Sequence, residues 1–404
     1  MPASLNDTPS GERIHIGLFG CRNAGKSSLI NALTGQSLAI VSACKGTTTD
    51  PVSKAMELLP LGPVLLTDTP GMDDASTLGE ARIEKARQVL RNADIALLVI
   101  DASCGMSPFD RTLLTEIQQR KIPYLVIYNK IDLVPEFIVP EEIKDHAIRV
   151  SANKGTGINE LKEKIAHLVG RTKTQPLLTD LVPEHALVVL VIPCDGSAPK
   201  GRLILPQQQT IRELLDAHCQ VVAVQVEELP GIITMLSNKI SLVVTDSQVF
   251  GRVSQIVPQQ IPLTSFSILF ARYKGQLEAF VEGAIVLKSL ADNDPVLISE
   301  GCTHHRQCAD IGTVKLPGWI RRFTDTEPAF SFTSGNTFPS ALTSYKLIIH
   351  CGGCMLNAQE MHYRQLLAQK GNVPMTNYGI AIAYMHGILP RVLEPFPHIL
   401  EKLK

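Results

Sequence analysis

The stretch IHIGLFGCRNAGKS, residues 14 to 27, decides the fold of the first part of this chain. Its first seven residues have the pattern of a buried strand, and they run into GCRNAGKS, which fits G-x-x-x-x-G-K-[ST]. The helix-forming residues SLINALTG follow. A strand, a glycine-rich loop and a helix in this order predict a phosphate-binding loop, in which backbone N–H groups face phosphate oxygens.

Each residue type in this loop has a physical reason. Gly20 and Gly25 let the backbone curl around phosphates, and the helix N-terminus adds positive potential. Lys26 is expected to reach the β- and γ-phosphates, and the Ser27 hydroxyl is expected to ligate Mg²⁺. The residues expected to contact the nucleotide from this loop are Gly20, Asn23, Ala24, Gly25, Lys26, Ser27 and Ser28.

A second apolar strand, PVLLTDTPG at residues 63 to 71, also ends in polar residues. The Asp68 carboxylate is expected to bind Mg²⁺ directly or to orient its ligands, and the Gly71 N–H is expected to donate a hydrogen bond to the γ-phosphate. The next strand pattern is ADIALLVIDAS. Open α/β sheets bind ligands at the carboxyl ends of their strands, so these motifs predict one site.

The base-recognition motif is YLVIYNKID, which ends in Asn129-Lys130-Ile131-Asp132. The Asp132 carboxylate can accept hydrogen bonds from N1–H and the 2-amino group of guanine, and adenine lacks both donors. RVSANKG then supplies Ser151 and Ala152, which are expected to contact the base. Together the motifs predict a GTP-binding domain that uses GTP and Mg²⁺.

The composition of the whole chain limits the classes of protein to which it can belong. At 404 residues, 45% hydrophobic and 19% charged, it should fold throughout into two or three domains. A net charge of −1 gives no electrostatic reason to expect nucleic acid or an anionic membrane as partner. The longest apolar runs are too short to span a bilayer, and the polar N-terminus lacks a secretory pattern. The expected location is cytoplasmic, where nine cysteines do not indicate a disulfide framework.

The middle of the chain predicts a small α/β domain over residues 185–260, after a linker at 172–184. HALVVLVI, CQVVAVQV and ISLVVTD are apolar strand patterns with helical patterns between and after them. This alternation predicts a three-stranded parallel sheet. Because so thin a sheet leaves open edges, we expect it to pair across a two-fold axis and form a homodimer.

Two strand patterns in the last domain, residues 261–404, end in loops of cysteine and histidine. One leads to Cys302-Thr-His-His-Arg-Gln-Cys308, and SYKLIIH leads to Cys351-Gly-Gly-Cys354. If the strands are parallel, the loops meet at one edge of the sheet. The candidate metal ligands are Cys302, His304, His305, Cys308, His350, Cys351 and Cys354.

Three interpretations of these ligands compete. A redox dithiol would use Cys351 and Cys354 but leaves Cys302 and the histidines without a role. A structural zinc site of the Cys₃His type fits the ligand types. A 4Fe–4S cluster on Cys302, Cys351 and Cys354 would leave one iron with an exchangeable position. The residues alone leave zinc and the cluster as open alternatives.

Residues 12 to 171 resemble the Ras-like GTPase domain of the group that includes MnmE (TrmE) and Era. The resemblance implies that Thr48, in the switch-like segment from Ser42 to Asp50, closes on Mg²⁺. Met72 stands where Ras-type enzymes have a water-orienting glutamine, which implies slow intrinsic hydrolysis. Asn23 stands where potassium-activated members of the group carry asparagine, so K⁺ is a further expected cofactor; a plain loop residue is the alternative.

The combination of a P-loop domain, a small α/β domain and the pattern Cys302-x-His304 … His350-Cys351-x-x-Cys354 resembles the HydF family, the maturation GTPases of iron–iron hydrogenases. The resemblance covers essentially the whole chain. It implies a 4Fe–4S cluster on the three cysteines, with His304 and His350 as further site residues. The fourth iron ligand stays open among these histidines, Cys308 and water.

The same resemblance implies a function and partners. The family acts as scaffold or carrier for the two-iron precursor of the hydrogenase active site, with FeFe-hydrogenase and radical-SAM maturases as partners and a homodimer or higher oligomer as the assembly. The fold expected is α/β throughout: a GTPase domain at 1–171, a dimerisation domain and a cluster-binding domain. The alternatives are a ribosome- or tRNA-associated GTPase with a zinc site, and a GTP-regulated dithiol oxidoreductase.

Overall fold

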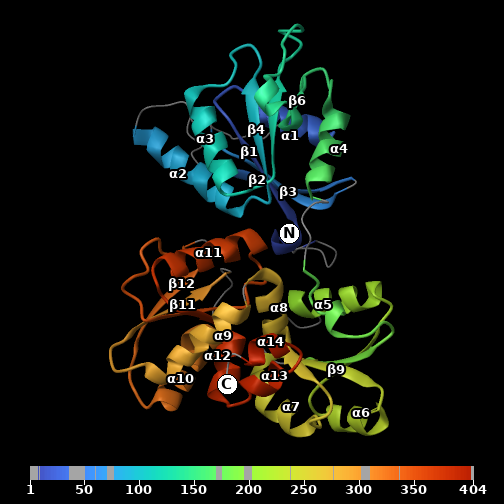
Figure 1. Cartoon of the computed structure of the whole chain (residues 1–404), viewed down its shortest axis with the longest axis vertical. Coiled ribbons are helices and arrows are strands. Elements are labelled where there is room, and N and C mark those ends of the chain that lie inside the picture. The colour runs from blue at the N-terminus through green and yellow to red at the C-terminus, as the bar shows by residue number, and fades with distance from the viewer. Residues whose placement is uncertain are drawn as a thin grey trace. The chain divides into compact units, whose positions relative to one another are not determined.

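The structure is a computed structural model that describes residues 8, 10–35, 51–59, 61–70, 77–169, 175–194, 203–236, 238–275, 277–301, 310–335 and 337–401. The chain divides into two compact units, residues 1–173 and 174–404, and each is described by itself (Figure 1). Among the helices in the described ranges, none is both long and apolar enough to cross a membrane.

The first unit is a six-stranded sheet in the order β2-β3-β1-β4-β5-β6, parallel except for β2, which runs antiparallel to β3. Helices α2 and α3 lie on one side of the sheet and α1 and α4 on the other (Figure 1). The strands are β1 (Ile14–Phe19), β2 (Val52–Leu58), β3 (Gly62–Asp68), β4 (Ile95–Asp101), β5 (Tyr124–Asn129) and β6 (Ala147–Arg149). The helices are α1 (Lys26–Thr34), α2 (Thr77–Asn92), α3 (Pro108–Gln119) and α4 (Ile158–Val169).

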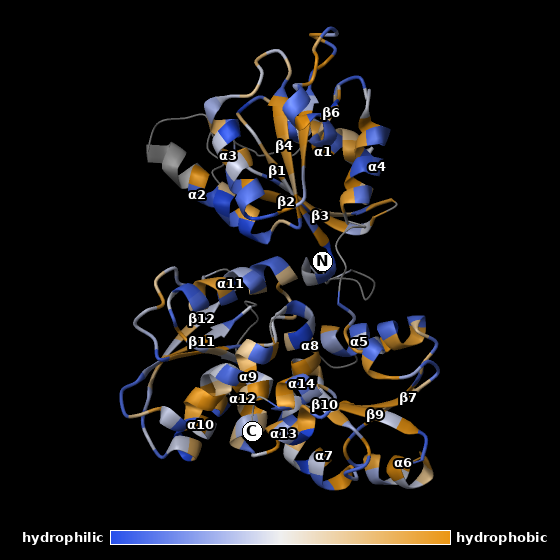
Figure 2. Cartoon of the chain, viewed as in Figure 1, coloured by the Kyte–Doolittle hydropathy of each residue, from blue (hydrophilic) through white to orange (hydrophobic). Residues whose placement is uncertain are grey.

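The strands of this sheet are buried because helices cover both of its faces. Every side chain of β4 from Ile95 to Ile100 is buried, and Figure 2 shows the central strands as hydrophobic. Continuous apolar runs are typical of parallel strands covered on both faces. The predicted strand, loop and helix over residues 14 to 34 are confirmed, whereas the antiparallel edge strand β2 was not predicted.

The second unit begins with a four-stranded parallel sheet in the order β10-β9-β7-β8. Its strands are β7 (Leu187–Val191), β8 (Gln220–Val224), β9 (Ile240–Thr245) and β10 (Leu263–Ser265). Its helices are α5 (Leu205–Asp216), α6 (Leu229–Leu236) and α7 (Phe250–Ile256). The prediction of three strands was wrong, because β10 has only three residues and lies beyond the predicted boundary at residue 260, too short to give an apolar run.

A second four-stranded parallel sheet follows in the order β12-β11-β13-β14. Its strands are β11 (Pro295–Glu300), β12 (Ala329–Ser334), β13 (Leu347–His350) and β14 (Met375–Asn377), of which β11 and β13 were predicted. The helices of this part are α8 (Phe266–Lys274), α9 (Leu277–Ile285), α10 (Leu316–Thr324), α11 (Ala358–Lys370), α12 (Tyr378–Met385), α13 (Leu389–Val392) and α14 (Pro397–Leu400). One continuous hydrophobic core joins the two sheets of this unit, from Leu177 to Ile399.

Short single-turn helices complete the connections. They are η1 (Ser10–Glu12), η2 (Glu141–His146), η3 (Thr179–Leu181), η4 (Ser247–Val249), η5 (Val286–Ser289) and η6 (Ile311–Lys315). The element η3 lies within the segment predicted as a linker, and the preceding Leu177 and Leu178 are buried in the core of the second unit. From residue 175 onward the segment is therefore packed against the second unit.

Strand β8 is an open edge of the first sheet in the second unit. Gln220 N donates to Ala186 O at 2.8 Å, and Val224 O accepts from Ile192 N at 2.8 Å. Because alternate residues of a parallel strand bond to the same neighbour, Gln220, Val222 and Val224 face β7, and the backbone groups of Val221 and Ala223 face outward. An edge of this kind can pair with a second copy.

We predict that Ala223→Pro lowers the oligomeric mass, because it removes one outward-facing N–H without removing a bond to β7. Size-exclusion chromatography with light scattering, at matched protein concentrations, measures the effect. Ala223→Val keeps the N–H and serves as the control, so it should keep the wild-type mass. A folded proline variant with the wild-type mass would show that β8 is not the pairing edge.

Candidate functional site

The phosphate loop after β1 has backbone angles that require glycine. Gly20 has φ 136° and Gly25 has φ 94°, the left-handed side that side chains disfavour. A Cβ on Gly20 would lie 2.1 Å from Val99 O. The buried Lys26 ammonium donates to Gly20 O at 2.9 Å and Cys21 O at 3.0 Å, so the loop holds a cation at its centre.

Two of the residues predicted for the magnesium site, Ser27 and Asp68, are in contact. The Ser27 hydroxyl donates to Asp68 Oδ2 at 2.6 Å, since the register of β1 and β3 sets Leu18 opposite Asp68. Asp68 Oδ1 is buried without a hydrogen-bond partner among the described residues. Burial raises the pKa of Asp68, and Ser27 and Lys26 oppose that shift. A hydroxyl beside a buried, under-bonded carboxylate is a donor set that Mg²⁺ takes in nucleotide sites.

Asn129 joins the phosphate loop to the base-recognition loops. Its Nδ2 donates to Ala24 O at 3.0 Å, and its Oδ1 accepts from Ala152 N at 3.0 Å. Ser151 donates from Oγ to Asp132 Oδ1 at 2.6 Å, and this bond lowers the pKa of Asp132. An ionised Asp132 is the acceptor that recognition of guanine requires.

Residues of the phosphate loop and Asp68 line one cavity of about 460 Å³. Its walls include residues of the phosphate loop, of the strand that ends in Asp68, and Lys130, whose ammonium pairs with Asp101 at 2.6 Å. Arg22 and Thr69 also line the cavity and were not predicted, because neither belongs to a recognised motif position. Thr48, Gly71 and Met72 lie outside the described residues.

The close approach of Gly25 to Asn129 gives a prediction. A Cβ on Gly25 would lie 2.2 Å from Asn129 Nδ2, so Gly25→Ala should displace the amide that joins the loops. We expect the dissociation constant for a non-hydrolysable GTP analogue to rise by at least about tenfold, or roughly 1.4 kcal/mol, by isothermal titration calorimetry.

Gly35→Ala is the matched control for backbone strain. Gly35 has φ 64°, but a Cβ there would meet nothing within 4 Å. The control should lose about 1–3 kcal/mol of stability in thermal unfolding and keep its nucleotide affinity. Equal affinities for the Gly25 variant and the wild type would contradict the bridging role of Asn129.

The second candidate site lies at the carboxyl ends of β11 and β13. These strands pair in parallel with Ser299 opposite His350, and Cys351 N donates to Ser299 O at 2.9 Å. The Cys351 sulfur accepts from Gly301 N at 3.0 Å and from Gly353 N at 3.4 Å. The sulfur is thus enclosed by backbone donors from both strand ends.

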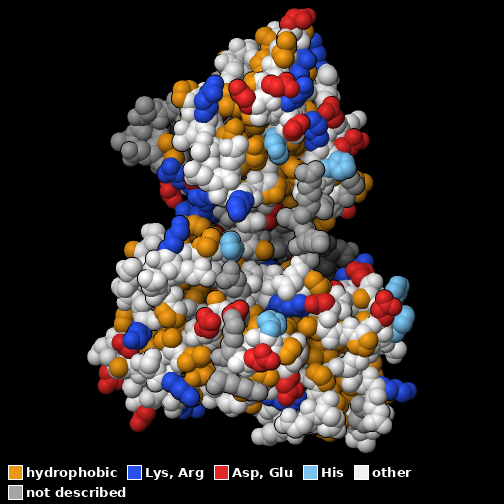
Figure 3. Space-filling view, viewed as in Figure 1, with side chains coloured by type: hydrophobic (Ala, Val, Ile, Leu, Met, Phe, Trp, Pro, Cys, Tyr) orange, Lys and Arg blue, Asp and Glu red, His pale blue; other side chains and the backbone are white. Residues whose placement is uncertain are grey.

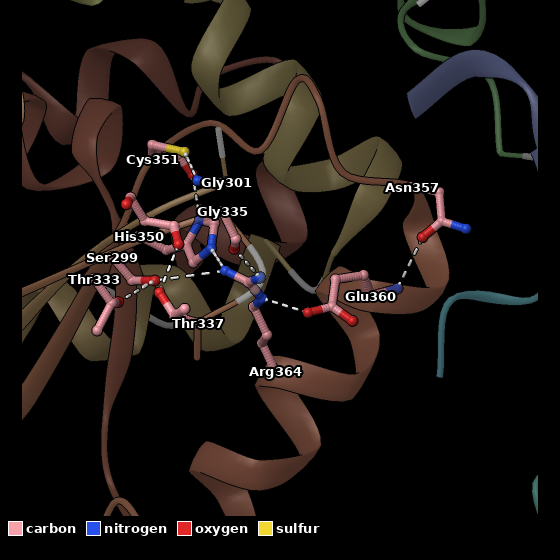
Figure 4. A network of polar contacts seen from close by, with 11 residues as sticks. Ser299, Gly301, Thr333, Gly335, Thr337, His350, Cys351, Asn357, Glu360 and Arg364 are labelled. Carbon is pink, nitrogen blue, oxygen red and sulfur yellow. Dashed lines mark hydrogen bonds and ion pairs between the residues drawn. The ribbon is translucent and has the colours of Figure 1, made fainter. Parts of the chain in front are cut away.

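A buried arginine supports this edge from α11 (Figure 4). Arg364 is fully buried, and its guanidinium stacks over the Phe338 ring at 4.9 Å. It donates to Glu360 Oε1 at 2.8 Å and to Gly335 O at 2.7 Å. Its Nη1 lies 3.0 Å from His350 Nε2. No sequence motif indicates this network, since Arg364 lies in an ordinary helical pattern.

The contacts of His350 fix its tautomer. Arginine can only donate, so Nε2 of His350 accepts the bond from Arg364. Nδ1 then carries the proton and donates to Cys351 O at 2.8 Å. Burial and the Arg364 charge lower the pKa of His350 to about 3. Because both ring nitrogens are engaged, His350 as a metal ligand stays a prediction that would require its ring to leave Arg364.

The surroundings of the two thiols in the CGGC loop favour their protonated forms. Burial raises the pKa of Cys351 to about 11 and also raises the pKa of Cys354. Reactive dithiols have lowered pKa values, so this loop does not fit a thioredoxin-like dithiol. A bound metal supplies the positive charge that releases such protons.

The predicted ligands of the first loop, Cys302, His304, His305 and Cys308, lie outside the described residues. Within the described ranges, no three or more His, Cys, Asp or Glu side chains are grouped to hold a metal ion. The described part of this site therefore consists of Cys351, Cys354 and their surroundings.

Comparison with known proteins places both units. Family models match residues 177–275 as the hydrogen maturase F dimerization domain, 278–395 as its tetramerization domain and 15–130 as a 50S ribosome-binding GTPase. The two hydrogen maturase F matches together span more than half of the chain.

The curated relatives match the first domain. The tRNA modification GTPase MnmE of Laribacter hongkongensis is 36% identical over 161 residues, 39% of this chain and 35% of that protein. MnmE of Aquifex aeolicus is 36% identical over 160 residues, with the same shares. The chain thus spans about a third of the length of these relatives.

Among solved structures, Era in complex with MgGDPNP and a 16S ribosomal RNA segment is 30% identical and covers 41% of this chain and 59% of that chain, at a TM-score of 0.35. At that score the structural likeness adds nothing to the assignment, which rests on the family matches and on the MnmE relatives. The chain belongs to the hydrogen maturase F family, and its first domain is a GTPase domain of the MnmE group.

Proposed function

We propose that this chain binds and hydrolyses GTP with Mg²⁺ in its first domain and holds a 4Fe–4S cluster on Cys302, Cys351 and Cys354 in its last. On this proposal it carries or assembles the two-iron precursor of the FeFe-hydrogenase active site, in the cytoplasm, with radical-SAM maturases and the hydrogenase as partners. When bound, such a cluster would offer one iron with an exchangeable position.

One observation carries the cluster proposal. Gly301 N lies 3.0 Å from the Cys351 sulfur, and Cys302 is the next residue in the chain. Consecutive Cα atoms lie about 3.8 Å apart, so the first cysteine loop starts beside the Cys351 sulfur. This closeness supports a shared pocket for three thiolates.

The surroundings of the thiols fit an iron–sulfur group. Backbone N–H groups that point at sulfur, such as those of Gly301 and Gly353, are a common way of stabilising cluster thiolates. A Cβ on Gly352 would meet nothing within 4 Å, so no described neighbour crowds that side of the loop. A Cys₃His zinc site would need a histidine nitrogen; both nitrogens of His350 are engaged, so His304 or His305 would have to supply it.

The tRNA-associated alternative draws on the MnmE likeness, which is confined to the first domain. On the face drawn in Figure 3, acidic and basic side chains are interspersed over both units, in line with the net charge of −1. Nucleic-acid sites gather basic residues on one face. The observations therefore favour hydrogenase maturation.

The GTPase part is tested by steady-state phosphate release. We expect slow hydrolysis and a preference for GTP over ATP. The preference follows because the Asp132 carboxylate accepts hydrogen bonds from guanine. We also expect a higher rate in K⁺ than in Na⁺, since Asn23 has φ 62° and lines the nucleotide cavity. Asn23→Ala should remove the K⁺ effect. Equal rates in both salts would refute the potassium proposal, and equal use of ATP would refute the guanine assignment.

The cluster part is tested by metal analysis of protein purified without air. We expect about four iron and four sulfide per chain, with an optical absorption typical of 4Fe–4S clusters. Cys351→Ser and Cys354→Ser should each lose most of the iron and sulfide. Cys104→Ser, a free and exposed cysteine of the first unit, is the control and should keep both. Stoichiometric zinc without sulfide would contradict the proposal.

A further inference from the structure

The last turn of α8 carries two cations on opposite sides, the partly buried Arg272 and the buried Lys274. Arg272 and Lys274 are two residues apart, which on a helix of 3.6 residues per turn separates them by about 200°. The Arg272 side chain is 13% exposed, and Lys274 is 5% exposed. Each of them meets a different segment of the second unit.

Lys274 binds the cysteine loop. Its ammonium donates to Leu356 O at 2.7 Å, to Cys354 O at 3.3 Å and to Gly353 O at 3.5 Å. It also lies 5.6 Å from the centre of the Phe270 ring. Three carbonyls from four consecutive residues thus converge on one cation, which fixes the path of the loop after Cys351.

Arg272 binds the segment that leaves the first unit. Its guanidinium donates to both oxygens of Asp180, with Nη1 2.9 Å from Oδ1. Nη1 also lies 3.5 Å from Pro176 O and from Leu177 O, and the group lies over the Phe396 ring at 5.6 Å. The boundary between the two units falls at residues 173 and 174, so these contacts come directly after it.

Residues 177–179 of the same segment are also bound by a second side chain, that of Glu213. Glu213 of α5 accepts from Leu177 N, Leu178 N and Thr179 N at 2.9 to 3.0 Å. Held by Glu213 and Arg272 together, the segment has a defined position against α8. A displacement of the segment would therefore act on the turn that carries Lys274.

We propose that Arg272 and Lys274 are positioning residues, which make the last turn of α8 a mechanical connection between the segment leaving the GTPase domain and the cysteine loop. Lys274 sets the path of the loop and places a positive charge beside Cys354. Arg272 ties that turn to residues 176–180. The inference rests on the proposed cluster site, and it gives residues 176–180 a hydrogen-bonded route to that site.

The experiment compares five variants, one of them a control, after anaerobic reconstitution with iron and sulfide. The readouts are the reduction potential of the cluster, by titration followed with electron paramagnetic resonance, and the rate at which a ferrous chelator removes iron. Lys274→Met should make reduction of the cluster about tenfold less favourable, which lowers the reduction potential by about 59 mV for one electron. It should also speed iron loss. Lys274→Arg keeps the charge and should restore most of the potential.

The linking contact is tested on its own. Asp180→Asn and Arg272→Met should keep the wild-type potential, because neither changes a group beside Cys354, and should speed iron loss by at least about threefold. Asp180 is 41% exposed, so its variant should fold. Arg252→Gln breaks the exposed pair of Arg252 with Glu227 at 2.8 Å in the same unit. This control should change neither readout.

The outcomes separate the inference from the function on which it rests. A Lys274→Met protein with wild-type potential and iron loss would overturn the positioning role. If Lys274→Met changes the potential and the rate of iron loss, whereas Asp180→Asn and Arg272→Met both keep the wild-type rate of iron loss, the proposed connection is overturned. Wild-type protein that takes up neither iron nor sulfide would refute the proposed function instead. The rate at which iodoacetamide alkylates Cys354 then tests the connection in metal-free protein, and rates equal to wild type in the Asp180 and Lys274 variants would overturn it.

Discussion

The parallel register of β11 and β13 is the constraint on which the cysteine site depends. It sets Ser299 opposite His350, so both strands end at the same level and their loops begin side by side. The bond from Gly301 N to the Cys351 sulfur follows directly from that alignment. A shift of one residue would turn His350 away from the core and part the two loops, because side chains alternate along a strand. The nucleotide site repeats the arrangement, with Asp68 opposite Leu18.

The buried Arg364 side chain stabilises this register of β11 and β13. Its guanidinium reaches Gly335 after β12, His350 at the end of β13 and Glu360 on α11. A buried arginine is tolerated only when its donors are satisfied and its charge is paired, and removing one partner from such a network costs on the order of 3–5 kcal/mol. The network therefore holds both ring nitrogens of His350 in hydrogen bonds, and metal binding by the thiols of Cys351 and Cys354 stays a proposal. On the other side of the loop, Lys274 holds the carbonyls that follow Cys351.

The sequence predicted what depends on local pattern. The apolar runs before the phosphate loop and before Asp68 form the predicted strands β1 and β3, and β11 and β13 were also predicted from apolar runs. The nucleotide-binding roles of the residues after β1 and β3 stay predictions. The short strands β10 and β14 were missed, because three residues give no periodicity. Arg364 and Lys274 were missed for another reason. Each looks like an ordinary surface cation in its helix, and only the fold brings Arg364 to His350 and Lys274 to Leu356.

Anomalous X-ray diffraction from crystals of anaerobically reconstituted protein, recorded at the iron and zinc absorption edges, would identify the metal held by the cysteine loops. We expect anomalous density for four iron atoms, three of which are bonded to the sulfurs of Cys302, Cys351 and Cys354. His350 should still be hydrogen-bonded to Arg364. A single zinc ion at this position, or iron bonded to the His350 nitrogen in place of one of the three sulfurs, would contradict it.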